Sequence, residues 1–334
     1  MRAALLCAAA LFLAGASCES DDGALKQSKQ ATGYDEGMIT LPVIDDLWDF
    51  ADPEGTEAKF REALDQVPPE DEARRAELIT QIARTYGLRG KFDEAHALLD
   101  EVAEMLPRTG DYVETRYLLE RGRAFNSAGE KEKAKQLFLQ AVETGKLAKE
   151  DYLTIDAMHM LGIVEEPEVA TEWQKLGLRM VEETHSDKAR QWTGSLTNNL
   201  GWTYHDKGEY ETALAYFEQG LAYREKEDKE PALRIAKWTV ARCKRSLGRT
   251  EEALQEQLAI IEEYFSDFDP TKEVAGPFND ASYISEEIGE CYLALGKSEE
   301  SKPYFKAAHE LLSKDDWLAQ NEPDRIARLK ELSD

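Results

Sequence analysis

Apolar residues recur at helical intervals along most of the chain, with a small residue at a fixed place among them. Ile79, Ala83 and Tyr86 are four and three residues apart, so they share one face of a helix. The small residue in the middle of this face recurs about every 40 residues. These reference positions are Ala83, Gly122, Gly162, Gly201, Ala241 and Gly289. A period of this length predicts stacked copies of one helical unit, because a single helix pair cannot bury its own apolar face.

Each unit predicts two helices joined by a short turn. Seven positions after the reference residue, five units carry a glycine that ends the first helix in a left-handed conformation: Gly90, Gly129, Gly208, Gly248 and Gly296. Apolar residues sixteen positions after the reference, such as Phe138 and Phe217, form the inward face of the second helix. Thr250 and Ser298 precede paired glutamates and are the predicted N-caps of their second helices.

The unit around Gly201 carries a family resemblance. Leu200-Gly201-Trp202-Thr203-Tyr204, Gly208-Glu209-Tyr210, Ala213 and Ala215-Tyr216-Phe217 resemble a near-consensus tetratricopeptide repeat. The resemblance implies an all-α, right-handed, TPR-like helical solenoid of about six to seven helix pairs over residues 41–315. The third unit departs from the pattern, since it lacks the turn glycine and has a short link at Glu165-Glu166-Pro167. Residues 316–334 add a capping helix, with Ile326 and Leu329 facing inward.

The first residues are typical of an export signal. Arg2 precedes the apolar run from Ala3 to Leu13, which is too short to span a bilayer as a helix and fits a signal peptide within residues 1–17. Two processing routes fit the following residues. Cleavage after Ala16 would release a secreted or periplasmic protein, whereas Gly15-Ala16-Ser17-Cys18 resembles a bacterial lipobox with lipidation at Cys18. The polar residues 18–40 are then a flexible tether.

The net charge restricts the possible partners, and the positions of the cysteines bear on disulfide formation. The net charge is −26, and so acidic a surface repels nucleic acid and anionic membranes, leaving a lipid on Cys18 as the only membrane contact. Cys243 and Cys291 occupy equivalent sites in successive units. Stacked helices are about 8–10 Å apart, so we expect these two cysteines not to form a disulfide.

No motif indicates catalysis. The five histidines form no HExxH and have no Cys or His partner at ligand spacing, so no metal site is expected. The sequence contains neither a GxGxxG motif nor a P-loop. We therefore expect no enzyme activity and no cofactor.

A partner-binding groove is the remaining candidate site. First helices line the concave side of such solenoids, and their stripe facing away from the second helix lies three before, one after and four after the reference residue. Arginine, asparagine, histidine and tryptophan gather there: Arg84, Arg123, Asn126, Asn198, Trp202, His205, Trp238, Arg242 and Arg245. These side chains bind carboxylates and supply flat apolar area. A simpler interpretation is that the arginines solvate a helix face and pair with neighbouring glutamates.

The function that follows is a protein–protein interaction scaffold or adaptor outside the cytoplasm, with a partner segment in the groove. The alternative is a sensing solenoid that binds a small anion or an acidic peptide.

Overall fold

The computed structural model describes residues 43–272 and 280–334. These residues form helices and connecting segments, with no strand among them. The chain divides between Trp192 and Thr193 into two compact units. We call residues 43–192 the N-terminal unit and the described residues after 192 the C-terminal unit. The all-α fold expected from the sequence is confirmed.

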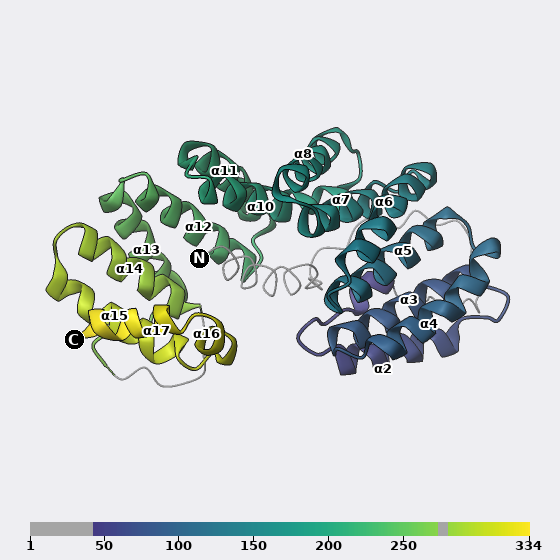
Figure 1. Cartoon of the computed structure of the whole chain (residues 1–334), viewed down its shortest axis with the longest axis horizontal. Helices are drawn as coiled ribbons and strands as arrows, with labels where there is room; N and C mark the ends of the chain where they lie inside the picture. The colour runs from purple at the N-terminus through teal and green to yellow at the C-terminus, as the bar shows by residue number, and fades with distance from the viewer. Residues whose placement is uncertain (1–42, 273–279) are drawn as a thin grey trace, which may run out of the picture. The chain divides into compact units, whose positions relative to one another are not determined.

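The N-terminal unit contains three helix pairs (Figure 1). They are α3 (Glu72–Leu88) with α4 (Phe92–Met105), α5 (Asp111–Ser127) with α6 (Lys131–Ala148), and α7 (Asp151–Val164) with α8 (Pro167–Glu183). A half-repeat precedes them, with the 3-10 helix η1 (Ile44–Leu47) and helix α2 (Pro53–Gln66). The short helices η2 (Leu106–Arg108) and α9 (Asp187–Arg190) connect or end the pairs. The short link expected in the third unit is confirmed, because α8 begins at Pro167.

The C-terminal unit contains the other three pairs (Figure 1). They are α10 (Trp192–Asp206) with α11 (Tyr210–Glu227), α12 (Ala232–Ser246) with α13 (Thr250–Tyr264), and α14 (Ala281–Ala294) with α15 (Ser298–Leu312). The expected end cap consists of two helices, α16 (Asp316–Asn321) and α17 (Pro323–Ser333). Leu329 is fully buried against Phe305 and Leu312 in one core cluster, so α17 covers the last pair as the sequence predicts.

The predicted turn glycines adopt the expected conformation. All five have positive φ, from 71° at Gly90 to 83° at Gly129. The predicted caps at Thr250 and Ser298 are wrong by one residue, because the N-cap positions belong to Arg249 and Lys297. The N–H of Arg249 bonds back to the carbonyl of Lys244, which holds the residue after the glycine outside both helices. This closed turn therefore fixes where the second helix starts.

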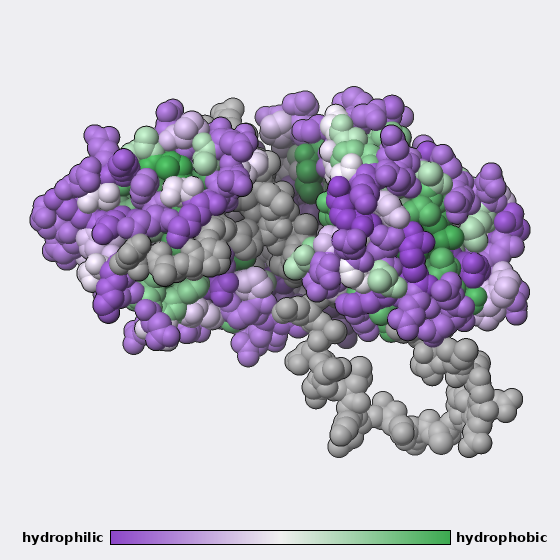
Figure 2. Space-filling model, turned by 90° about the horizontal axis from the view of Figure 1, so that it is seen from below, coloured by the Kyte–Doolittle hydropathy of each residue, from purple (hydrophilic) through white to green (hydrophobic). Residues whose placement is uncertain are grey.

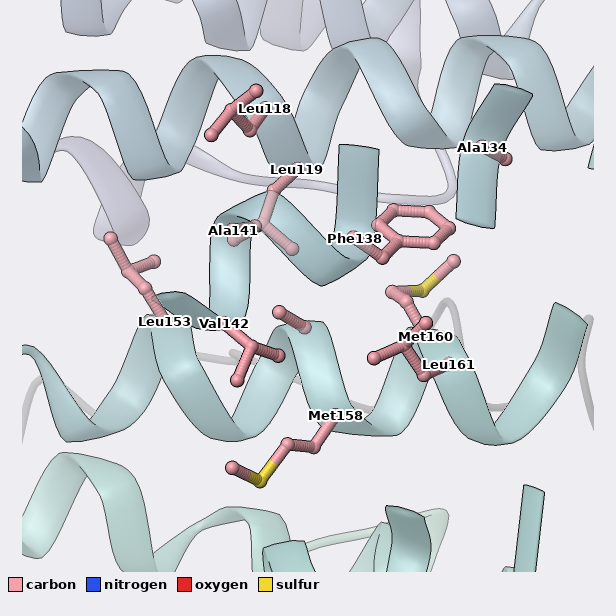
Figure 3. Packing of buried hydrophobic residues seen from close by; sticks show 11 residues of the cluster. Leu118, Leu119, Ala134, Phe138, Ala141, Val142, Leu153, Met158, Met160 and Leu161 are labelled. Atoms are coloured by element: carbon pink, nitrogen blue, oxygen red, sulfur yellow. The ribbon is translucent and has the colours of Figure 1, made fainter. Parts of the chain in front are cut away.

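Close contact between the helices of a pair holds each repeat together. In the N-terminal unit the ring of Phe138 fills the space beside Gly122, where an added Cβ would come within 2.4 Å of Cε1 of that ring. Figure 3 shows Phe138 from α6 among Leu119 of α5 and Leu161 of α7. Apolar burial of this kind contributes about 25 cal/mol per Å² and is the main stabilising term.

Cys243 and Cys291 are both buried and free, which confirms that they are not bonded to each other. Hydrophilic residues make up most of the surface visible in Figure 2. Within the described ranges, none of the helices combines the length and the apolar character needed to cross a lipid bilayer.

Candidate functional site

The predicted groove residues all lie on first helices, and the structure divides them between the units. Arg84, Arg123 and Asn126 belong to α3 and α5 of the N-terminal unit. The other six belong to α10 and α12 of the C-terminal unit: Asn198, Trp202, His205, Trp238, Arg242 and Arg245. We call the surface formed by α3, α5 and α7 the N-terminal face, and the surface formed by α10, α12 and α14 the C-terminal face.

On the C-terminal face, two arginines share one buried glutamate. Arg242 bonds Glu287 of α14 through Nη1, and Arg245 donates from Nε at 2.8 Å and from Nη2 at 3.1 Å to the same carboxylate. Glu287 is 2% exposed. Burial alone would raise the pKa of Glu287, but the charges of both guanidinium groups outweigh it and lower the pKa. Glu287 therefore stays ionised and orders both arginines.

The other glutamates of this part of α14 are already engaged by α17. Arg325 donates to Glu286 at 3.0 Å and 2.5 Å, and Arg328 pairs with Glu290. Glu287 is thus left to neutralise Arg242 and Arg245 together. Arg242 and Arg245 thus share one hydrogen-bonded carboxylate, whereas Arg325 pairs with two, Glu286 and Glu322.

The sequence expectation about these arginines needs a correction. We expected the Arg242 and Arg245 side chains to point away from the core, but they are only 17% and 24% exposed and contact a buried carboxylate. Long side chains that pair across repeats become ordered by the neighbouring helix. Charge reversal at Arg242 or Arg245 would therefore affect folding.

Aromatic rings enclose the Arg242 guanidinium. Its Cζ atom lies 5.5 Å from the ring centre of Trp202 and 5.6 Å from that of Trp238. Trp202 is 8% exposed and meets Phe217 edge-on at 5.1 Å, so it is a core residue more than a groove lining. The indole N–H of Trp238 and the Nε–H of Arg242 are buried and have no hydrogen-bond partner within the described chain.

His205 and Asn198 complete this face. Nε2 of His205 lies 2.9 Å from the hydroxyl of Ser246. Burial, reinforced by the positive charge of Arg242, lowers the pKa of His205 to about 4, so the ring is neutral at pH 7. Asn198 is half-buried, and its side-chain amide makes no hydrogen bond to any residue that the structure describes.

The N-terminal face is balanced in charge. Arg123 donates to Glu120 at 3.0 Å and to Asp156 at 2.5 Å, and Arg84 reaches Glu120 at 3.5 Å. Two arginines thus face two carboxylates. Asn126 is half-buried near the end of α5.

Part of this face is also covered by the chain itself. The Arg84 guanidinium lies 5.2 Å from the ring centre of Trp48 and 5.1 Å from that of Phe50, both from the segment before α2. Residues of the same chain therefore cover Arg84, and its part in binding a partner stays a prediction.

Pairing of the arginines with neighbouring glutamates, the simpler interpretation of the sequence, is what the structure shows, although the sequence analysis did not name Glu120 and Glu287 as the partners. Glu120 and Glu287 each stand two residues before the reference position of their unit. The preceding unit has an arginine one residue after its own reference position, Arg84 or Arg242. Stacking brings these two register positions together, so an Arg and an acid at these places predict an ion pair between repeats.

Comparison with known families and structures agrees with this architecture. Models of the tetratricopeptide repeat match residues 75–106, 193–227 and 286–311, and neither model describes a catalytic domain. The search of curated proteins finds no match.

Several solved structures have a similar fold. The apo form of RapI has a TM-score of 0.63 at 12% identity, over 85% of this chain and 80% of that chain. The STAND signal transduction ATPase with a tetratricopeptide repeat sensor from Pyrococcus horikoshii has a TM-score of 0.61 at 16% identity. That match covers 84% of this chain and only 42% of the ATPase.

The apo form of the quorum sensor NprR from B. thuringiensis has a TM-score of 0.55 at 13% identity, over 84% of this chain and 75% of that chain. At such identities the likeness concerns the fold alone. With the repeat register, the turn glycines and the helix pairs, these matches show that the chain contains tetratricopeptide repeats and has the fold of a tetratricopeptide repeat solenoid.

Proposed function

We propose that the protein is an exported, non-enzymatic scaffold that binds an acidic segment of a partner protein on its C-terminal face. The observation that carries the proposal is the sharing of Glu287 by Arg242 and Arg245. Because two guanidinium groups share one hydrogen-bonded carboxylate, an additional carboxylate from a ligand would give Arg242 and Arg245 one anionic partner each. Buried charges of this kind favour a compensating partner.

The surroundings of the two arginines favour a peptide carboxylate over a bare ion. Asn198 offers an amide that can bond an extended backbone, and the neutral His205 adds no competing charge. The acidic remainder of the chain repels anions elsewhere, so electrostatic attraction is local to this face.

Peptide sensing is the second candidate function. NprR is described as a quorum sensor, and the ATPase from Pyrococcus horikoshii carries its repeats as a sensor. The similarity of fold to these two proteins supports a signalling peptide as the ligand of the same face. A scaffold and a sensor differ in whether the bound segment belongs to a larger protein.

Site-specific crosslinking in the native host tests the proposal. A photoreactive amino acid at Asn198 should capture one defined protein through an acidic segment, while the same group at Glu218, exposed on α11, should not. Arg245→Gln should lower the capture about tenfold, because it removes one cation and leaves the Arg242–Glu287 pair in place. Capture of a short free peptide would favour the sensor.

The control for this experiment is Arg249→Gln, since Arg249 pairs with Glu252 at the start of a second helix. Arg325 and Arg328 are unsuitable as controls because they hold α17 against α14. Equal capture from Asn198 and Glu218, or capture unaffected by Arg245→Gln, would overturn the assignment of this face.

Export is part of the proposal and rests on the first residues, which lie outside the described part of the chain. The apolar run from Ala3 to Leu13 and the small residues before Cys18 support it. The intact mass of the mature protein tests it. A chain starting at Ser17 would indicate ordinary cleavage, and a diacylglycerol adduct lost in Cys18→Ser would indicate a lipoprotein, whereas an unprocessed chain would contradict export.

A further inference from the structure

A short segment of the chain lies across the first helices of the N-terminal unit. Residues 44–50 include only the single turn of η1, yet their side chains contact α2, α3, α5 and α9. Ile44 and Trp48 are buried, whereas Asp46 and Asp49 are exposed. Anchoring side chains that alternate with solvated ones are typical of a bound linear segment.

The first anchor is a carboxylate. Asp45 accepts a hydrogen bond from Nη1 of Arg116 at 3.1 Å and also pairs with Lys188 of α9. Residues of α3 and α5 also hold Arg116, because its Nη2 donates to Tyr112 at 3.0 Å and to Glu77 at 3.3 Å. The cationic pocket for Asp45 is therefore assembled by the repeats themselves.

The second anchor is aromatic. The indole N–H of Trp48 donates to Oε1 of Gln81 at 2.9 Å, and its ring stacks on Phe50 at 4.7 Å. The Arg84 guanidinium lies over both rings and forms an ion pair with Glu120. A glutamine acceptor and a positioned guanidinium together select an indole with an N–H over a plain hydrophobic side chain.

Side-chain packing, more than backbone hydrogen bonding, connects this segment to the rest of the unit. Its backbone bonds to α2 at Asp49, whose N–H donates to the Thr56 hydroxyl at 3.0 Å and whose carbonyl accepts from the same hydroxyl at 2.9 Å. The other polar anchors are side-chain contacts to helices that are complete without the segment.

We propose that the N-terminal face is a second peptide-binding surface, which residues 44–50 of the same chain occupy. A partner's segment with a carboxylate three residues before a tryptophan displaces these residues and binds in their place. The partner is recognised by an acid for Arg116 and Lys188 and an indole for Gln81 and Arg84. This surface uses other residues than the C-terminal face, so it is independent of the function proposed above.

A binding experiment on the full chain tests the exchange. The probe is a fluorescein-labelled peptide with the sequence of residues 43–52. The double variant Asp45→Asn with Trp48→Ala weakens the cis segment and should bind the probe at least about tenfold more tightly than the parent chain. A peptide carrying the same two changes should bind the variant at least about tenfold more weakly than the natural one.

Matched variants locate the bound peptide. Lys188→Ala, added to the double variant, should weaken peptide binding several-fold because it removes an exposed half of the acid pocket. Arg179→Ala, at an exposed position of α8, should leave binding unchanged. A folded double variant that does not bind the probe, or equal effects of Lys188→Ala and Arg179→Ala, would overturn the proposal.

Hydrogen exchange on the parent chain decides the matter if the double variant fails to fold. The amide of Asp49, which donates to the Thr56 hydroxyl, should exchange at least about a hundredfold faster than amides in the middle of α3 and α5, because the segment detaches locally. Exchange of the segment only through global unfolding would make it a permanent part of the core and refute the proposal. Exchange between copies, seen as a dimer by light scattering, would assign the face to self-association instead.

Discussion

Gly201 of α10 lies directly against the ring of Phe217 in α11. A Cβ atom at Gly201 would come within 2.4 Å of Cε1 of Phe217, and Phe217 is only 2% exposed. The ring of Phe217 therefore limits the space at Gly201. This contact sets how closely the two helices of the pair approach.

Gly201→Ala should therefore lower the free energy of unfolding by about 1–3 kcal/mol through overpacking. The control is Gly87→Ala in α3, where an added Cβ meets no atom within 4 Å. There alanine should leave stability unchanged or raise it by up to about 1 kcal/mol, because it favours the helix more than glycine does. Urea unfolding of both variants measures the difference, and equal effects would show that the repeat register is wrong.

The sequence predicted the features that depend on local chemistry. The turn glycines, the Gly–Phe spacing within a pair and the inward Leu329 of α17 follow from helix periodicity and the repeat. The prediction failed at the start of α13 because the closed glycine turn, and not the hydroxyl of Thr250, determines the cap position.

Contacts between distant residues could not be predicted in the same way. Asp45 and Arg116 are 71 positions apart, and the segment that carries Asp45 has no repeat equivalent. The sharing of Glu287 by Arg242 and Arg245 depends on which acids α17 has already engaged. Such pairings are set by the rotation between stacked repeats, which the spacing of residues does not specify.

The buried position of Glu287 predicts an asymmetric effect of mutations. Arg242→Met with Arg245→Met leaves this carboxylate buried and without its two cations, which should cost about 3–5 kcal/mol of stability at pH 7. Glu287→Gln should cost less, because the part-exposed arginines can reach water. Thermal or urea unfolding of the variants compares the two losses.

The pH dependence of the double methionine variant provides a second readout. Without the arginines, burial raises the pKa of Glu287 above its value in the unfolded chain, so protonation of this carboxyl stabilises the folded variant. The loss relative to the parent should shrink as the pH falls. A loss of stability that is independent of pH would contradict a role for the buried charge. The control Arg249→Met should lower the free energy of unfolding by no more than about 0.5 kcal/mol at every pH.

Cys243 and Cys291 should be inert in the native protein. Burial raises the pKa of Cys243 to about 11 and that of Cys291 to about 12, so neither is a thiolate at pH 8. Iodoacetamide at that pH should leave both unmodified in the folded chain and alkylate both in denaturant. Intact mass after export should show no loss of two hydrogens, and such a loss in the monomer would contradict the free thiols.

Acid should release the segment that carries Asp45. Burial alone would raise the pKa of Asp45, but Arg116 and Lys188 outweigh it and lower the pKa from 3.8 to about 2. A carboxyl whose pKa is lower in the folded chain stabilises the fold above its unfolded pKa, and this contribution disappears as the pH falls toward the folded value. The contribution is about 2 kcal/mol at neutral pH.

Asp45→Asn removes this contribution while keeping the shape of the side chain. Its free energy of unfolding should therefore be about 2 kcal/mol below that of the parent at pH 6. The gap should close between about pH 4 and pH 2, because the parent then becomes protonated at Asp45 as well. Asp46→Asn is the matched control, since Asp46 is the exposed neighbour, and it should show little gap at any pH. A constant gap for Asp45→Asn, or the same pH profile for Asp46→Asn, would mean that the Asp45 charge does not hold the segment on the N-terminal face.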